Sequence, residues 1–133
     1  MRNILILISV LLISLFIGLF MKSRLGKVRR KLRLQIFESE LGNKYGKRAT
    51  VVQFSTTFCS ECRAAKALIS DVVSTENYIA YIEIDAESNL ELVRKVDIRS
   101  TPTTLFLDKA GFEIARATGA PKRDQLIKVI ASL

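Results

Sequence analysis

Two cysteines three positions apart, Cys59 and Cys62, are the residues of this chain best suited to covalent chemistry. The 133 residues contain no other cysteine and no histidine. The lack of histidine excludes a Ser-His-Asp or Cys-His catalytic unit and an imidazole metal site. Two cysteines cannot supply a four-cysteine zinc or iron–sulfur site within one chain. Dithiol chemistry without a metal or cofactor is therefore favoured, with a metal shared between two molecules or a structural disulfide as alternatives.

The local pattern places these cysteines where a strand gives way to a helix. Residues 49–54 are β-branched and apolar, which predicts a buried strand. Residues 60–74 then show helical spacing of apolar side chains, so the helix begins at about Cys59. A thiol at a helix N-terminus faces unpaired backbone N–H groups, which lower its pKa and favour the nucleophilic thiolate. Cys62, one turn later, can resolve a mixed disulfide. A purely structural bridge over so short a loop would stabilise little.

The rest of the chain predicts an α/β fold with a mixed central sheet flanked by helices. Alternating apolar residues suggest a short strand near residues 32–37, although their spacing also suits a helix continuing from the N-terminus. One helical turn and a loop are expected within residues 39–48. The remaining expectations are a strand over 78–84, a helix over 89–96, a hairpin of strands 103–107 and 112–118 around a turn at 108–111, and a helix over 121–133.

Several motifs, in order along the chain, resemble the thioredoxin family. They are F-S-T-T-F-C-S-E-C-R-A-A-K, then Y-I-E-I-D, then V-D-I-R-S-T-P-T-T-L-F-L-D, followed by a glycine-marked hairpin and a final helix. The resemblance covers roughly residues 33–133 and implies a thioredoxin-like fold. It implies that Cys59 is the nucleophile and Cys62 the resolving cysteine. It also implies that Pro102 is cis beside the disulfide, and that Phe58, Thr101 and Pro102 bind the substrate, the Thr101 backbone by strand pairing.

Five positions depart from the thioredoxin pattern. Phe58 stands where tryptophan is usual, and Ser60-Glu61 where Gly-Pro is usual. A buried aspartate and its companion lysine are replaced by Gln53 and Tyr81. Glu61 has three interpretations: a charge that raises the pKa of the Cys59 thiol, a proton acceptor for Cys62, or a solvated glutamate in the first helical turn.

The N-terminal segment predicts a membrane anchor. Residues 4–20 carry no charge, and as a helix they would span roughly 26 Å, near the lower limit for crossing a bilayer. A buried core helix and a cleaved signal peptide are the alternatives. We expect an anchor over 1–21, a basic linker over 22–32 and the thioredoxin-like domain over 33–133. This organisation is similar to that of small membrane-tethered thioredoxin-like proteins of bacteria.

The charge of the chain is concentrated beside that segment. Residues 1–48 hold 11 Lys/Arg and 2 Asp/Glu, or +9, whereas residues 49–133 hold 10 and 11, or −1, which together give the net +8. Seven basic residues between Lys22 and Arg33 follow the apolar run and one precedes it. The positive-inside rule therefore predicts a single-pass protein of the cell membrane with its domain in the cytoplasm; an extracytoplasmic domain is the alternative. The basic stretch is expected to contact lipid headgroups, and nucleic-acid binding is not expected.

Two functions are consistent with these features. The first is a membrane-anchored thiol–disulfide oxidoreductase that exchanges electrons with protein disulfides and dithiols through C-S-E-C and acts as a monomer. The second is a thioredoxin-like adapter that holds a membrane partner without turnover. The intact pair of cysteines favours the enzyme, because an adapter has no need of a dithiol.

Overall fold

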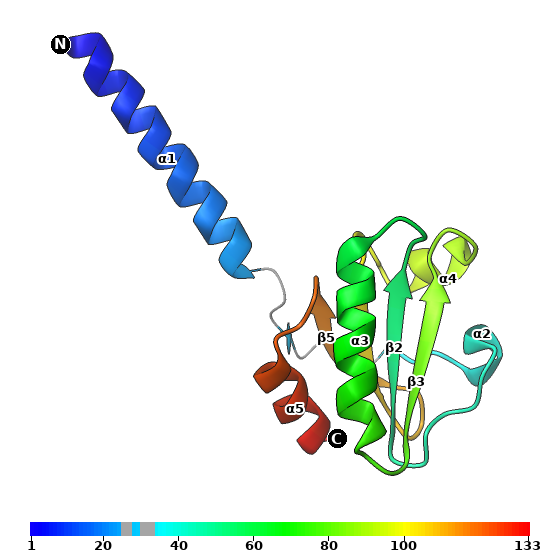
Figure 1. The fold of residues 1–133 in the computed structure, drawn as a ribbon. Coiled ribbons are helices and arrows are strands. Elements are labelled where there is room, and N and C mark those ends of the chain that lie inside the picture. The colour runs from blue at the N-terminus through cyan, green and yellow to red at the C-terminus, as the bar shows by residue number, and fades with distance from the viewer. Residues whose placement is uncertain (25–27, 30–33) are drawn as a thin grey trace.

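The computed structural model describes residues 1–24, 28–29 and 34–133. The chain begins with the long helix α1 (Arg2–Arg24), which extends away from the remaining elements (Figure 1). Within α1, Asn3–Lys22 has a mean hydropathy of 3.1, and none of its most apolar 18-residue window is buried. Among the described residues this is the one helix long and apolar enough to cross a membrane. It contains the apolar run expected from the sequence and continues beyond it.

The central sheet has four main strands and a two-residue edge strand. The strands are β1 (Val28–Arg29), β2 (Ala49–Ser55), β3 (Ile79–Asp85), β4 (Thr103–Asp108) and β5 (Glu113–Thr118). Their spatial order is β1-β5-β4-β2-β3. The β2–β3 pair is parallel, and β2–β4, β4–β5 and β1–β5 are antiparallel. Every residue of β2 is buried, as its β-branched composition predicts.

Helices cover both faces of this mixed sheet. On one face, α3 (Ser60–Ser74) and α5 (Arg123–Ala131) pack against the sheet (Figure 1) through a core containing Ala65, Ile69, Phe106 and Leu126. On the other face, α2 (Glu38–Leu41) and α4 (Leu90–Lys95) pack against a second core. The α/β fold with a mixed sheet is therefore confirmed. The sheet therefore places the start of α3 close to the end of β2, since only four residues separate Ser55 from Ser60.

The expected strand near residues 32–37 is the main difference from the sequence interpretation. Residues 30–33 lie outside the described part. In the described part, Gln35 forms an isolated bridge with Phe112. No regular strand forms there, because Phe37 already caps α2, and its N–H donates to the Glu40 carboxylate at 2.8 Å. The final helix is also shorter than the expected 121–133, since it begins at Arg123.

Candidate active site

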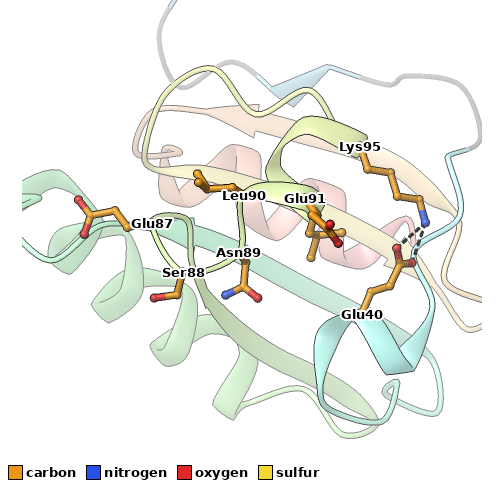
Figure 2. A pocket seen from close by; sticks show the side chains of 8 residues that line it. Glu40, Glu87, Ser88, Asn89, Leu90, Glu91 and Lys95 are labelled. Carbon is orange, nitrogen blue, oxygen red and sulfur yellow. Dashed lines mark hydrogen bonds and ion pairs between the residues drawn. The ribbon is translucent and has the colours of Figure 1, made fainter.

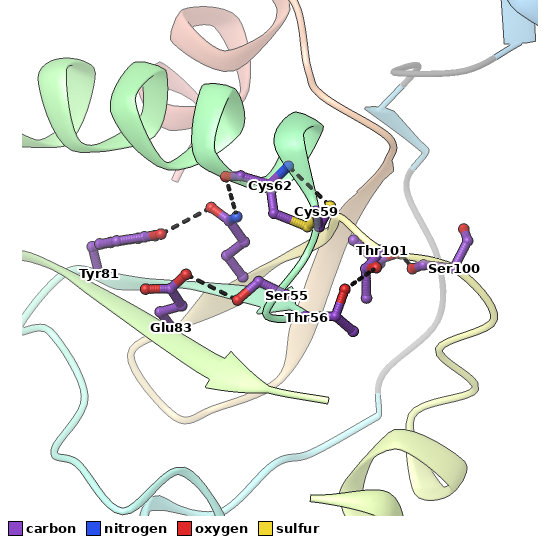
Figure 3. The surroundings of a disulfide bond; sticks show 10 residues. Ser55, Thr56, Cys59, Cys62, Tyr81, Glu83, Ser100 and Thr101 are labelled. Atoms are coloured by element: carbon purple, nitrogen blue, oxygen red, sulfur yellow. Dashed lines mark hydrogen bonds between the residues drawn. A yellow bond between two sulfur atoms is a disulfide. The ribbon is translucent and has the colours of Figure 1, made fainter. Parts of the chain in front are cut away.

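The two cysteines lie at the start of α3 and form a disulfide. The sulfur atoms are 2.12 Å apart and the Cα atoms 5.1 Å apart. Cys59 is the N-cap of α3, and its sulfur accepts a hydrogen bond from the Cys62 N–H at 3.1 Å (Figure 3). The strand ends at Ser55, so a short loop is enough to bring Cys59 to the helix terminus. This position supplies the N–H groups that stabilise a thiolate.

The two sulfur-bearing residues differ in their exposure. Cys59 is half-buried, whereas Cys62 is only 3% exposed. Phe58, immediately before Cys59, is 98% exposed. A substrate can therefore reach Cys59 beside an uncovered aromatic ring, while Cys62 is shielded. Glu61 lies exposed in the first turn of α3.

A second loop approaches the one that carries Cys59. The Thr101–Pro102 peptide bond is cis, as the resemblance implied, and Pro102 is buried. The hydroxyls of Thr101 and Thr56 lie 3.3 Å apart, which joins this loop to the segment between β2 and α3 (Figure 3). The carbonyl of Pro102 accepts a hydrogen bond from the Gly119 N–H at 2.8 Å. The sequence-predicted residues Thr101 and Pro102 are thus held in a loop that contacts the segment leading to Cys59.

Beneath Cys62, a glutamine and a tyrosine form a chain of hydrogen bonds. Nε2 of Gln53 donates to the Cys62 carbonyl at 2.9 Å, and the Tyr81 hydroxyl donates to Oε1 of Gln53 at 2.8 Å (Figure 3). Gln53 is fully buried. Burial raises the pKa of the Tyr81 hydroxyl, and the charge of Glu83 raises it further. The pair therefore stays uncharged, and the two positions singled out from the sequence are in direct contact.

A groove opens beside the disulfide, and we call it the cysteine groove. Its volume is about 430 Å³, and it is lined by Ser55, Thr56, Thr57, Cys59, Cys62, Arg63, Lys66, Glu83 and Asp85. Lys66 Nζ lies 2.5 Å from Glu83 Oε2, and the Ser55 hydroxyl donates to Glu83 Oε1 at 2.9 Å. The hydrogen bond from Lys66 lowers the pKa of Glu83, against an opposing effect of burial. The half-buried Cys59 thus meets solvent in this groove beside an ionised pair, and Cys62 lines the same groove with only 3% of its surface exposed.

The sequence interpretation did not identify the ion pair between Lys66 and Glu83, which lie 17 positions apart in the chain. The sequence did contain a pattern that could have indicated Glu83. Side chains alternate between the two faces along the predicted strand over 78–84, so Glu83 lies on the same face of the sheet as Tyr81. In the described part of the chain, no three His, Cys, Asp or Glu side chains are grouped to hold a metal ion.

A larger pocket of about 650 Å³ lies between α2 and the start of α4 (Figure 2). An ion pair between Lys95 and Glu40, with a 2.7 Å separation, closes one side of it. Its lining is mainly acidic and polar, with Leu90 as an exposed apolar residue. Neither cysteine lines this pocket. The cysteine groove is therefore the place where dithiol chemistry can meet a substrate.

Comparison with known proteins agrees with this geometry. A sequence profile described as thioredoxin matches residues 29–132. Thioredoxin H2 of Arabidopsis thaliana is 28% identical over 111 residues, covering 84% of this chain and 80% of the relative. Thioredoxin of Gallus gallus is 31% identical over 97 residues, covering 73% of this chain and 90% of the relative.

Solved structures show the same fold. Thioredoxin NaTrxh of Nicotiana alata superposes with a TM-score of 0.58 at 27% identity, covering 65% of this chain and 73% of that chain. Thioredoxin of Malassezia sympodialis gives a TM-score of 0.61 at 19% identity, covering 80% and 93%, which shows a likeness of fold alone.

Proposed function

The chain belongs to the thioredoxin family and is a thiol–disulfide oxidoreductase, and we propose that it works as a membrane-anchored enzyme on protein substrates through Cys59 and Cys62. The observation that carries this proposal is the disulfide at the N-terminus of α3, where the Cys62 N–H contacts the sulfur of Cys59. The half-buried Cys59 is the nucleophile, and the shielded Cys62 is the resolving cysteine. Both cysteines are among the residues that line the cysteine groove.

In the reducing direction, the reaction proceeds in two exchanges. The Cys59 thiolate attacks one sulfur of a substrate disulfide, a mixed disulfide forms, and the other substrate sulfur leaves as a thiolate. Cys62 then loses its proton and attacks the sulfur of Cys59, which expels the second substrate thiolate and forms the Cys59–Cys62 disulfide. Two electrons pass from the chain to the substrate. The reverse sequence oxidises a substrate dithiol.

The substrate is proposed to lie across Phe58 and the loop of Thr101 and Pro102. The exposed ring of Phe58 offers apolar contact area next to the nucleophile. The Thr101 backbone precedes β4 and can pair with an extended substrate segment. Glu61, exposed in the first turn of α3, is proposed to modulate the pKa of the Cys59 thiol.

The membrane part of the proposal rests on α1 and on the charges that follow it. We propose residues 1–21 as the anchor, 22–32 as the basic linker and 33–133 as the enzyme domain. The excess of Lys and Arg after the helix favours a cytoplasmic domain whose linker contacts anionic lipid headgroups. We propose a monomer, because one chain supplies both cysteines and the whole groove.

A trapping experiment tests the proposed chemistry. Cys62→Ser removes the resolving thiol, so substrates should remain attached to Cys59 through mixed disulfides that dithiothreitol releases. The matched control carries both Cys59→Ser and Cys62→Ser and should trap nothing. Identical products from the single and double variants, or no product from the single variant, would refute the assigned roles.

A reporter experiment tests the proposed orientation. A fluorescent protein that matures only in the cytoplasm, fused after Leu133, should be bright and should sediment with membranes. A dark fusion together with an active periplasmic reporter would reverse the orientation. A bright fusion in the soluble fraction would contradict the anchor.

A further inference from the structure

The resolving cysteine, Cys62, is linked by hydrogen bonds to two residues of the sheet. One chain of hydrogen bonds runs from Tyr81 on β3, through Gln53 on β2, to the carbonyl of Cys62 in the first turn of α3. The two separations are 2.8 Å and 2.9 Å. Gln53 is fully buried and Cys62 nearly so, so water competes little for these bonds. The neighbouring Cys59 instead lies at the helix N-cap and takes no part in this chain of bonds.

The chemistry of the groups fixes the direction of both hydrogen bonds. A backbone carbonyl only accepts, so the amide nitrogen of Gln53 must face Cys62 and its oxygen must face Tyr81. Burial, with the charge of Glu83, raises the pKa of Tyr81, so its hydroxyl keeps the proton that it donates. Rotating the amide would leave buried polar groups unpaired. Gln53 is therefore held in one orientation, and neither residue is free to take up a proton.

Cys62 must lose its proton before it can attack the mixed disulfide at Cys59. The groups around Cys62 limit where that proton can go. Gln53 does not titrate, and Tyr81 already carries its own proton. The charged groups near Cys62 line the cysteine groove, which is open to water: Arg63 and Lys66 from α3, and Glu83 and Asp85 from β3. Lys66 and Glu83 are already paired with each other.

Building on the function proposed above, we propose that Gln53 and Tyr81 are positioning residues for the resolving step, and that the proton of Cys62 leaves to water in the cysteine groove. The Cys62 thiolate then attacks the sulfur of Cys59 in the mixed disulfide, the Cys59–Cys62 bond forms, and the substrate leaves as a thiolate. The Gln53–Tyr81 pair gains and loses no proton. The rate of resolution should therefore follow one ionisation, that of Cys62.

The resolving step can be observed with 5,5′-dithiobis(2-nitrobenzoate) and the full reduced chain in detergent micelles. Attack by Cys59 releases one coloured thiolate, and the later attack by Cys62 releases the second. The wild-type rate of the second release should show one ionisation across the pH range. Two ionisations in the wild type would overturn the inference. Failure of the wild type to release a second thiolate would instead overturn the resolving role of Cys62.

Tyr81→Phe tests positioning. The variant removes the hydroxyl that orients Gln53, so the second release should slow by about tenfold while the first is unchanged. Tyr45→Phe is the matched control, because Tyr45 donates to the Ile36 carbonyl away from the cysteines and should leave both releases unchanged. Equal slowing of both releases in Tyr81→Phe, or no slowing, would show that the hydrogen bond does not position Cys62.

Gln53→Glu tests the uncharged character of the pair, and it covers the case in which Tyr81→Phe folds poorly. A protonated glutamate can keep both hydrogen bonds, since its O–H donates to the Cys62 carbonyl and its other oxygen accepts from Tyr81. The variant should add a second ionisation to the pH profile of the second release, and the first release should keep its profile. An unchanged profile of the second release would contradict the inference.

Discussion

Reducing the Cys59–Cys62 disulfide should lower the free energy of unfolding by no more than about 2 kcal/mol. The bridge joins residues only three positions apart, and loop-closure entropy gives about 2 kcal/mol for so short a loop at 25 °C, against about 3 kcal/mol for a 15-residue loop. Neither cluster of buried apolar side chains includes a cysteine. After reduction, a Cys59 thiolate at the N-terminus of α3 regains about 0.3–1 kcal/mol. The domain should therefore stay folded in both redox states.

Urea unfolding of the full chain in detergent micelles, with and without excess dithiothreitol, measures this difference. The reduced chain should also melt roughly 5–15 °C lower than the oxidised chain. The variant with both Cys59→Ser and Cys62→Ser is the control and should not respond to dithiothreitol. A loss above about 4 kcal/mol, or a reduced chain that does not fold, would refute the reasoning, because the disulfide would then be a structural cross-link.

Three further predictions concern the site and its support. The hydrogen bond from Lys66 lowers the folded-state pKa of Glu83. The ionised Glu83 therefore stabilises the folded state above the usual pKa of 4.5, and this contribution disappears as the pH falls through the lowered pKa. The urea midpoints of wild type and Lys66→Met should differ above pH 4.5 and converge in stronger acid. Phe106→Ala empties a fully buried position and should cost about 3–5 kcal/mol in urea unfolding. Phe58→Ala should change stability by less than about 0.5 kcal/mol, because the ring is 98% exposed, and should raise KM for a protein disulfide.

The strand and the helix that position the cysteines could be predicted, because each shows one regular pattern of apolar residues along its length. Apolar residues at helical spacing predicted a helix over residues 60–74, and the structure has α3 at Ser60–Ser74. The β-branched run predicted β2, which ends one residue later than expected, at Ser55. The position of Cys59 at the helix start followed from these two elements. The cis bond before Pro102 came from the family resemblance, since its local sequence is also that of a simple strand boundary.

Contacts across the fold could not be predicted from local patterns. The bond from Gln53 to Cys62 and the pair between Lys66 and Glu83 depend on how α3 sits over the sheet and on side-chain rotation. The alternation near residues 32–37 suggested a strand, but α2 begins at Glu38 and leaves only the bridge from Gln35 to Phe112. The edge strand β1 was not predicted, because two residues carry no usable periodicity.

The most direct test of the account is the rate at which the full chain catalyses the reduction of insulin by dithiothreitol. Wild type and Cys59→Ser are compared at equal concentration in the same detergent. We predict that wild type accelerates the precipitation of reduced insulin and that Cys59→Ser gives the rate of dithiothreitol alone. Equal rates for the two proteins would contradict the claim that Cys59 is the nucleophile of a thiol–disulfide oxidoreductase.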